Sequence, residues 1–409
     1  MSIDNVLNFK IKLPEYILSL IDLLNSNGYE AYAVGGCVRD YAMGRIPSDF
    51  DMTTNATPAE MLTVFNGYKV IETGIKHGTL TVMSENIPVE ITTYRVDGQY
   101  NDKRHPDEVY FTRNLREDVS RRDFTVNAMA YNDKSGLVDF YGGLRDIEKK
   151  LIVAVGDPDR RFKEDALRII RALRFASTLG FGIEKNTASA ARKNAKLLTN
   201  ISAERINVEL KKLLAGKNAI NVLTEYSDIL ACVSEEMFSF CEEKLKKLSD
   251  TPSDINVFLA FLLSDVSPSR ANEILSLLKF SNLEKKEITE LLRLCKKDFP
   301  KNKIEMKKII FETDISLIPK YLSLSSLLGG DTSSALSYYR EICENKECIY
   351  ISDLKINGDD ISQIGVVRGK KIGEILKKLL FAVINEEVQN EREALLELAK
   401  KHFVDRSTI

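Results

Sequence analysis

The stretch from residue 31 to residue 51 constrains the fold of this chain more than any other part of its sequence. An apolar run, Ala31–Val34, predicts a short strand, and the pair Gly35 and Gly36 predicts a turn into a helix over Cys37–Met43. The stretch then ends with Ser48–Asp51, in which two aspartates flank a phenylalanine. A strand, a glycine turn and a helix within so few residues predict an α/β region.

The two aspartates of this stretch, Asp49 and Asp51, are candidate metal ligands and catalytic residues. In a strand, residues i and i+2 point to the same face, so their carboxylates would project side by side while Phe50 turns into the core. Adjacent carboxylates repel, and each raises the pKa of the other unless a cation intervenes; Mg²⁺, with its preference for oxygen ligands, is the natural one. Two such ions can activate an attacking 3′-hydroxyl and stabilise a leaving pyrophosphate in an in-line displacement. An Asp-x-Asp alone is more often a surface turn, so the interpretation depends on the whole stretch.

The glycine turn offers a phosphate site beside these aspartates. Gly35 and Gly36 stand just before a helix, where exposed amide N–H groups and the helix N-terminus suit phosphate. Arg39 lies on the first turn of that helix and could reach a triphosphate. Together these residues indicate nucleotide-binding chemistry next to the candidate metal site.

A third carboxylate is expected from a neighbouring strand. Thr79–Met83 and Val89–Tyr94 are predicted to form a hairpin around the polar turn Ser84–Asn86. Glu90 alternates out of phase with the core-facing residues of the second strand, and we expect it to be catalytic. The alternative is a solvated strand residue or a partner for Arg95.

The organisation of the chain changes near residue 156. With 409 residues the chain is too long for one ordinary core. A helix over Leu13–Leu24 and the strands above give the first part its α/β character, whereas long amphipathic patterns rich in Leu, Lys and Glu follow. We therefore predict an α/β catalytic head at residues 1–155, followed by a helical neck at 156–220, a helical body at 221–330 and a helical tail at 331–409.

Composition excludes several classes of protein. The content of 44% hydrophobic and 29% charged residues is that of a globular protein in water, and no stretch approaches the roughly 20 apolar residues that span a bilayer. The N-terminus carries Asp4 and lacks a basic region followed by an apolar run, so we expect no signal peptide and a cytoplasmic location. Six cysteines without a Cys-x-x-Cys pair, and three histidines, disfavour a structural zinc site.

Charge permits an RNA partner without requiring one. The formal net charge is −2, but phosphate binding needs only a local basic surface. Two clusters supply candidates. They contain Arg160, Arg161, Lys163, Arg168, Arg171 and Arg174, and then Arg113, Arg116, Arg121 and Arg122.

The ordered motifs resemble the nucleotidyltransferase superfamily typified by DNA polymerase β. More closely, they resemble the class II tRNA nucleotidyltransferases, which include the CCA-adding enzymes and bacterial poly(A) polymerases. The resemblance covers almost the whole chain, and such an ordered series does not arise by chance. Beyond Gly35–Asp51 it includes Arg121–Ala128, Asp139–Gly143, Arg161–Arg168, Arg171, Arg174-Phe175 and Ala203-Glu204-Arg205.

This resemblance implies a fold and a set of site residues. The fold is an α/β head with a mixed sheet and helices, followed by an all-α neck, body and tail in an elongated, seahorse-like architecture. Asp49 and Asp51 are implied to bind Mg²⁺. The residues implied to contact the incoming nucleotide are Gly36, Arg39, Arg122, Arg171 and Arg174, mostly at its triphosphate, with Asp123 and Asn127 at the ribose.

The neck carries candidates for choosing the base. At 100° per residue, Glu164, Arg168 and Arg171 would share one helical face, with Asp165 at its margin. The opposite face would anchor the helix. The alternative is a solvated charged face with an i,i+4 pair worth only about 0.3–0.5 kcal/mol.

An acceptor carboxylate beside a donor guanidinium can pair with either cytosine or adenine. Asp165 would accept from the amino group that both bases carry, while Arg168 donates to the ring. Uracil and guanine present a carbonyl where Asp165 needs a donor, so they are disfavoured. Glu164 would orient Arg168. Together with the resemblance, which implies that the protein itself acts as the template, this pairing predicts selection of C and A.

Two further segments resemble parts of the family. Asp97–Pro106 resembles the flexible loop of enzymes that complete CCA, and we interpret His105 as a loop residue instead of a general base. The tail contains Ile356–Asp360, Gly369–Gly373 and then a helix predicted to run through Leu380 and Asn390 to Leu398. Its glycines and basic helix start suit an RNA backbone, which favours recognition of the tRNA elbow over a purely structural packing unit.

The predicted activity is addition and repair of the 3′-terminal CCA of tRNA from CTP and ATP. The partners are then the tRNA 3′ end and elbow, with no membrane and no protein partner implied. The nearest alternatives are a CC-adding or A-adding specialist, or a poly(A) polymerase. A catalytically silent RNA-binding protein is the alternative from another class, and the intact Asp49 and Asp51 argue against it. A His-Asp phosphohydrolase domain is excluded because His402 is the only histidine after residue 105.

Overall fold

The computed structural model describes residues 10–97, 109–238, 241–248, 250–366 and 369–403. The chain divides into two compact units. One comprises Met1–Thr251 with Leu277–Lys279, and the other comprises Pro252–Ser276 with Phe280–Ile409. The four-domain division predicted from the sequence stays a prediction.

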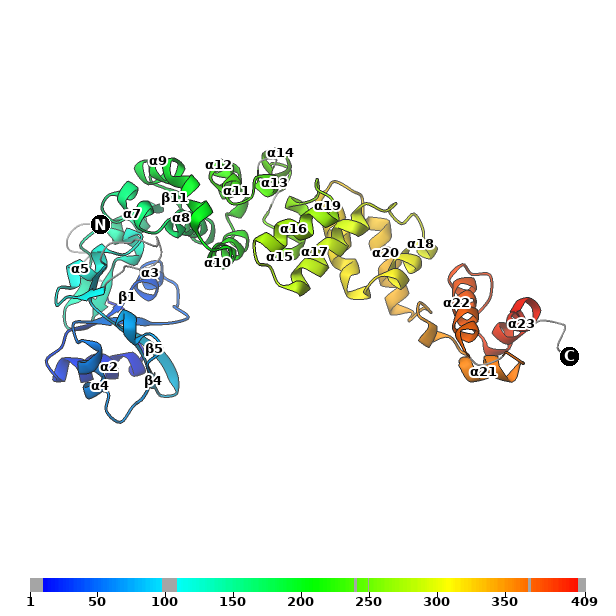
Figure 1. Ribbon diagram of the computed structural model, residues 1–409, viewed down its shortest axis with the longest axis horizontal. Helices are drawn as coiled ribbons and strands as arrows, with labels where there is room; N and C mark the ends of the chain where they lie inside the picture. The colour runs from blue at the N-terminus through cyan, green and yellow to red at the C-terminus, as the bar shows by residue number, and fades with distance from the viewer. Residues whose placement is uncertain (1–9, 98–108, 239–240, 249, 367–368, 404–409) are drawn as a thin grey trace. The chain divides into compact units, whose positions relative to one another are not determined.

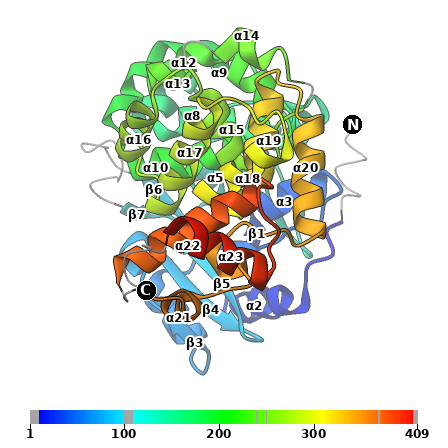
Figure 2. The ribbon, with the colours of Figure 1, turned by 90° about the vertical axis from the view of Figure 1, so that its right-hand side faces the viewer.

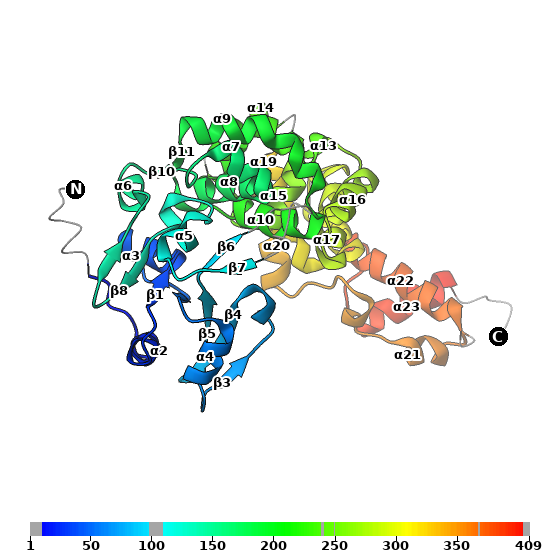
Figure 3. The same ribbon diagram turned by 60° about the vertical axis from the view of Figure 1, so that its left-hand side comes forward.

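A seven-stranded mixed sheet forms the centre of the head. Its strand order is β3-β4-β5-β2-β1-β8-β9, and only the β2–β5 pair is parallel. Figure 3 shows β1 and β8 toward one side of this sheet and β3 and β4 toward the other. The strands are β1 (Ala31–Val34), β2 (Asp51–Thr54), β3 (Lys69–Ile71), β4 (Thr79–Ser84), β5 (Ile87–Thr93), β8 (Ala130–Asn132) and β9 (Gly136–Val138).

Local signals placed the first elements correctly. Helix α2 (Glu15–Ser26) ends at Asn27, and Gly28 follows with φ +84°. The β4–β5 hairpin turns through Glu85 and Asn86, both in the left-handed region at φ 50° and 65°. A left-handed pair is what a two-residue hairpin turn requires, and asparagine tolerates it. Helices α2 and α4 (Pro58–Val64) pack against each other and contact β4 (Figure 1).

Helices dominate the rest of the first unit. Two small two-stranded sheets accompany them, β6 (Arg95–Asp97) with β7 (Val109–Phe111) and β10 (Leu151–Ile152) with β11 (Gly182–Ile183). After β11 the described chain is helical (Figure 1). The helices are α3 (Gly36–Ala42), α5 (Leu115–Ser120), α6 (Gly143–Glu148), α7 (Pro158–Glu164), α8 (Leu167–Leu179), α9 (Lys185–Asn194), α10 (Ala203–Leu214), α11 (Ala219–Glu225), α12 (Ser227–Ala231), α13 (Glu235–Phe238) and α14 (Cys241–Leu245).

The second unit is helical throughout its described residues. No helix in the described part of the chain combines the length and apolar character needed to cross a membrane. The mixed-sheet head followed by a helical region confirms the predicted fold class. The helices are α15 (Ile255–Leu262), α16 (Pro268–Leu277), α17 (Asn282–Cys295), α18 (Lys303–Glu312), α19 (Ile318–Leu327), α20 (Ser333–Glu344), α21 (Gly358–Gln363), α22 (Lys370–Ile384) and α23 (Arg392–Phe403).

The continuous tail helix predicted through Asn390 to Leu398 is wrong. The structure has two helices, α22 and α23, which lie side by side (Figure 2) and share one apolar core. The break follows Asn385, where Glu386 adopts φ +62°. Asn390 lies in the connecting loop, where its amide donates to the Asp353 carbonyl at 2.9 Å and accepts from the Lys355 N–H at 3.0 Å. These contacts come from residues more than thirty positions away, so helical periodicity did not reveal them.

Candidate active site

The two predicted metal ligands stand at the start of β2. Asp51 is the first residue of the strand and pairs in register with Val34 at the end of β1. Asp49 precedes the strand, so the prediction that both aspartates lie within it is wrong. The physical reason is the loss of a partner: after Val34 the chain turns at Gly35, and β1 offers no further residue for β2 to pair with.

Phe50 is turned into the core, as predicted. It is 8% exposed, and its ring lies 6.2 Å from the rings of both Tyr16 and Tyr41. Asp49 and Asp51 are both exposed. Burial of the intervening ring therefore anchors the segment and leaves the two carboxylates on its solvent side.

Glu90 lies next to Asp51 across the sheet. In the parallel β2–β5 pair, Met52 is opposite Ile91, so the residues just before them, Asp51 and Glu90, are neighbours. Val89 and Ile91 are buried and Glu90 is exposed, as its alternation predicted. Three acidic side chains thus gather at the exposed start of β2.

The pKa of Asp51 reports this crowding. It is raised above its ordinary value, first because the surrounding protein removes part of the water shell, and then because Glu90 and Asp49 add negative charge. Arg122 opposes these effects. Within the described residues, however, no group of three or more His, Cys, Asp or Glu side chains is arranged to hold a metal ion. The oxygen donors suit a hard divalent cation, and the ligand set stays a prediction.

The glycine turn is formed by a backbone that only glycine adopts easily. Gly35 has φ +79°, and its N–H donates to the Met129 carbonyl at 3.1 Å. A Cβ at this position would lie 3.1 Å from Arg122 Nη1. Any side chain would therefore strain the backbone and press on an arginine of the site.

A chain of hydrogen bonds joins the head to the neck through the predicted nucleotide-binding residues. Arg39 Nη1 donates to Asn127 Oδ1 at 2.7 Å, and Asn127 Nδ2 donates to Asp123 Oδ1 at 3.2 Å. Arg171 then donates to Asp123 Oδ2 from Nε at 2.8 Å and from Nη2 at 2.5 Å. Burial alone would raise the pKa of Asp123, but the charge and hydrogen bonds of Arg171 hold it at about 2. Residues far apart in the sequence are thus brought together as one ionised network.

Phe175 is a site residue to which sequence reasoning assigned no role. Its ring is 4% exposed and packs edge-on against Phe124 with centroids 5.8 Å apart. The guanidinium carbons of Arg39, Arg171 and Arg174 lie 5.4, 5.5 and 3.5 Å from its centroid. An aromatic face attracts cations, so Phe175 helps to gather three like charges. Its position directly after Arg174 was the available signal.

Asp118 is a second residue that the sequence did not reveal. It is fully buried and accepts hydrogen bonds from the Thr53 hydroxyl at 3.2 Å and from Arg121 at 3.1 and 2.8 Å. Arg122 Nη2 lies 3.6 Å from its other oxygen. Although burial raises the pKa of Asp118, the charges of these two arginines bring it below its ordinary value. Asp118 therefore fixes Arg122 beside the glycine turn.

The neck is not the single helix that the sequence predicted. Helix α7 ends at Glu164, Asp165 has an extended backbone at φ −144° and ψ 103°, and α8 begins at Leu167. Asp165 Oδ1 accepts the Leu167 N–H at 3.1 Å, an i,i+2 contact that stabilises the turn between the two helices. The expectation of one shared face for Glu164, Arg168 and Arg171 on a continuous helix is therefore wrong. The apolar face of α8 is buried as expected, at Ile169, Ile170, Leu173 and Ala176.

Glu164 nevertheless contacts Arg168 across this break. Its carboxylate accepts from Arg168 at 2.8 Å, from Arg161 at 2.7 Å and from Arg160 at 3.0 Å. Arg168, 8% exposed, also donates to the Arg161 and Arg121 carbonyls at 3.1 and 3.0 Å. The contact matches the predicted arrangement, and the orienting role of Glu164 stays a prediction.

Helix α10 supports both parts of the neck site. Arg205 donates to both oxygens of Asp165, at 3.3 and 2.8 Å. One turn later, Glu209 lies 3.5 Å from Arg171 and 2.8 Å from Arg174. Sequence reasoning quoted Arg205 within a motif without a role and did not mention Glu209. A charged pair four residues apart on an amphipathic helix was the available signal.

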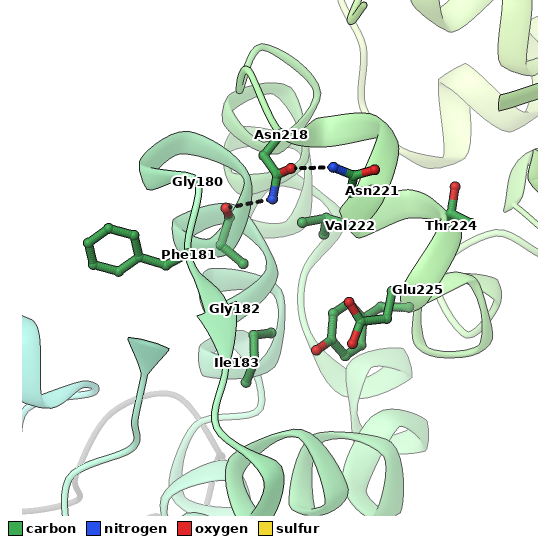
Figure 4. A pocket seen from close by; sticks show the side chains of 11 residues that line it. Gly180, Phe181, Gly182, Ile183, Asn218, Asn221, Val222, Thr224 and Glu225 are labelled. Carbon is green, nitrogen blue, oxygen red and sulfur yellow. Dashed lines mark hydrogen bonds between the residues drawn. The ribbon is translucent and has the colours of Figure 1, made fainter. Parts of the chain in front are cut away.

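A separate cavity of about 460 Å³ lies beyond the far end of α8 (Figure 4). Asn218 spans part of it, since its Nδ2 donates to the Ala176 carbonyl at 3.4 Å and its Oδ1 accepts from Asn221 at 2.7 Å. Glu225 lies on its rim, and no lysine or arginine is among the described residues that line it. The cavity thus differs in chemistry from the arginine-rich site.

Comparisons with known proteins cover almost the whole chain. Three family models match: "Poly A polymerase head domain" at residues 31–153, "Probable RNA and SrmB-binding site of polymerase A" at 180–227, and "tRNA nucleotidyltransferase domain 2, putative" at 250–399. The CCA-adding enzyme of Ligilactobacillus salivarius is 35% identical over 98% of each chain. That of Staphylococcus saprophyticus is 36% identical over 93% of this chain and 96% of the relative.

Solved structures give the same result for the fold. A crystal structure of the Bacillus stearothermophilus CCA-adding enzyme in complex with CTP is 29% identical and covers 95% of this chain and 98% of its own, with a TM-score of 0.78. A Thermotoga maritima CCA-adding enzyme complexed with tRNA is 21% identical, with 97% and 98% coverage and a TM-score of 0.69. At 21% identity, the similarity to the Thermotoga maritima structure supports the fold alone.

Proposed function

Because this chain belongs to the family of CCA-adding enzymes, which are tRNA nucleotidyltransferases, we propose that its head and neck form one site that adds C, C and A to tRNA. CTP and ATP are the nucleotide substrates, and pyrophosphate is released at each step. The observation that supports this site most strongly is the placement of three acidic residues, Asp49, Asp51 and Glu90, around the start of β2 within the same unit as the Arg39–Asn127–Asp123–Arg171 network.

In the proposed reaction, Asp49 and Asp51 hold divalent metal, with Mg²⁺ as the physiological ion and Glu90 as an additional acidic neighbour. When bound, two metal ions would lower the pKa of the attacking 3′-hydroxyl and neutralise charge on the leaving pyrophosphate. The raised pKa of Asp51 supports this assignment, because a bound cation relieves the repulsion between crowded carboxylates and so stabilises them.

The triphosphate is proposed to bind the arginines and the glycine turn. Arg39, Arg171 and Arg174 surround the Phe175 ring, and Arg122 borders Gly35. Guanidinium groups bind phosphate oxygens through paired, charge-assisted hydrogen bonds. Gly36 would present its amide at the start of α3.

The ribose is proposed to bind at Asp123 and Asn127. Asn127 Nδ2 uses one N–H on Asp123, and its second N–H is a donor for a sugar hydroxyl. Asp123 is fixed by Arg171 and remains ionised, so it keeps this amide oriented.

Base selection is assigned to Asp165 and Arg168. Asp165 Oδ2 accepts one hydrogen bond, from Arg205, and a carboxylate oxygen has room for a second from the amino group of cytosine or adenine. Arg168 would donate to the ring, held by Glu164. Replacing Asp165 with Ala should remove the preference for C and A over U and G in an incorporation assay. Retained selectivity would exclude this assignment.

The helical tail, residues 331–409 in the proposed division, would bind the tRNA elbow and so measure the distance to the 3′ end. Its basic α22 start follows Gly369. The segment proposed as the flexible loop, Asp97–Pro106 with His105, lies outside the described residues apart from Asp97.

The most informative test uses a tRNA transcript that ends at the discriminator base, with CTP and ATP supplied. We expect one product three nucleotides longer than the transcript. A product two nucleotides longer, a requirement for a preformed CC end, or a long A tail would each identify one of the specialist activities on this scaffold. No extension at all would indicate an RNA-binding protein without catalysis.

A further inference from the structure

Helix α10 places a buried carboxylate in contact with two of the arginines assigned to the triphosphate. Glu209 is 6% exposed, and its side chain lies 3.5 Å from Arg171 and 2.8 Å from Arg174. Both ion pairs join Glu209 to arginines of the cluster around Phe175. Its charge therefore acts on the two arginines.

The two arginines differ in how well their charges are balanced. Arg171 donates two hydrogen bonds to Asp123, and its pKa is raised chiefly by that carboxylate. For Arg174 the balance runs the other way. Burial lowers its pKa, Arg171 and Arg39 lower it further, and Glu209 is the main charge that opposes them. Arg174 therefore depends mainly on Glu209 for the balance of its charge.

The contact between Arg174 and Glu209 is close but badly formed. Arg174 Nε and Glu209 Oε2 are 2.8 Å apart, yet both atoms are buried and neither has a hydrogen-bond partner among the described residues. A buried ion pair is favourable only when its geometry is good and its remaining donors and acceptors are satisfied. This pair therefore balances charge without locking the two groups together.

We propose that Glu209 is an internal counter-anion that occupies Arg171 and Arg174 in the nucleotide-free enzyme and yields them to a triphosphate. This inference rests on the proposed role of both arginines in binding phosphate. Glu209 keeps the cluster neutralised while no nucleotide is bound, and it weakens the affinity for nucleotide and for pyrophosphate because it competes with both. It is a positioning residue that acts through the arginines.

The sign of one affinity change separates this role from a purely structural one. A scaffold residue that holds arginines in place should weaken nucleotide binding when it is changed. A competing anion should strengthen it. Glu209→Gln keeps the shape and removes the charge, so we expect CTP and inorganic tripolyphosphate to bind about tenfold more tightly. Glu209→Asp keeps the negative charge on a side chain that is one methylene shorter, so the increase in affinity should be smaller.

A matched control is available on the same helix. Glu204 is 65% exposed and lies 3.8 Å from Lys279, away from the arginine cluster. Glu204→Gln changes the net charge by the same amount and should leave both affinities unchanged. Binding is measured by titration calorimetry at fixed ionic strength on the full chain, with folding checked by circular dichroism.

The outcomes distinguish this inference from the proposed function. Arg174→Ala should weaken tripolyphosphate binding at least about tenfold. If it does not, the triphosphate assignment of Arg174 fails. If it does, while folded Glu209→Gln and Glu209→Asp bind both ligands no more tightly than the wild type, the assignment stands and the counter-anion role is overturned. Equal tightening by Glu204→Gln would also overturn it, because the effect would then be one of overall charge.

Discussion

The acidic residues at β2 and the network around Asp123 are both charged sites of the same unit, yet their electrostatics are opposite. At β2, Asp51 is crowded by Glu90 and Asp49, and its pKa is raised. Asp123 is almost fully buried, but Arg171 satisfies it and its pKa falls to about 2. The two sites thus contrast a compensated carboxylate, Asp123, which positions its neighbours, with a crowded one, Asp51, which is proposed to await a metal ion.

The largest expected effect is on the compensated side of this comparison. Asp123→Asn removes the buried partner of an ion pair and leaves Arg171, whose side chain is 32% exposed, with the longer contact to Glu209 at 3.5 Å. Breaking such pairs costs about 3–5 kcal/mol. We expect a loss of that size in the free energy of unfolding, measured by urea denaturation. A loss below about 1 kcal/mol would mean that the network is not what holds the head against the neck.

Acid should weaken the same network in a defined window. The pKa of Asp123 is lowered from 3.8 to about 2, so its contribution to stability is fully present above the unfolded value and is lost as pH falls from about 4 to 2. By linkage this contribution is about 2 kcal/mol. The wild type should lose stability in this window more steeply than Asp123→Asn. Parallel pH profiles for the two proteins would contradict the pairing.

The uncompensated side should respond to metal in the opposite way. The raised pKa of Asp51 means that its charge at neutral pH destabilises the metal-free protein. Asp51→Asn should therefore raise the melting temperature without metal by about 1–2 °C. It should also reduce the stabilisation that Mg²⁺ gives the wild type. Thermal denaturation with and without Mg²⁺ checks both, and an equal Mg²⁺ effect in the two proteins would place the metal elsewhere.

The smallest effect is expected where a shifted pKa belongs to an exposed pair. Arg113 lies 2.8 Å from Glu60 and helps to lower the pKa of that carboxyl to about 2, but the two side chains are 55% and 32% exposed. Solvent screens such pairs, so Arg113→Ala should cost less than about 1 kcal/mol. Urea denaturation of Arg113→Ala and Asp123→Asn under the same conditions compares the two losses in free energy of unfolding. If Arg113→Ala lowered the free energy of unfolding as much as Asp123→Asn does, burial would not determine how much an ion pair contributes to stability.

Elements set by local chemistry could be predicted from the sequence. The hairpin turn at Glu85 and Asn86, the helix end at Asn27 and the strand before Gly35 depend on neighbouring residues, and the structure has them where they were expected. The exposure of Glu90 follows from alternation within β5, and Phe50 is buried as predicted although it precedes β2.

Features set by distant residues could not be predicted. The break at Asp165 accompanies its pairing with Arg205, forty residues later, and Asn390 is held in a loop by Asp353 and Lys355. The place where β2 begins depends on where its partner β1 ends. Asp118 carries no local signal either, and the spacing of Arg205 and Glu209 on an amphipathic helix does not reveal which arginines Glu209 touches.

We propose that Asp49 and Asp51, at the start of β2, hold the metal ions that drive nucleotidyl transfer. The most direct test is single-turnover extension of a tRNA transcript that lacks CCA, with CTP, ATP and Mg²⁺, by the wild type and by Asp51→Asn. We predict a product three nucleotides longer from the wild type and none from Asp51→Asn, with the affinity for tRNA changed by less than about threefold. Full CCA addition by Asp51→Asn would contradict the account.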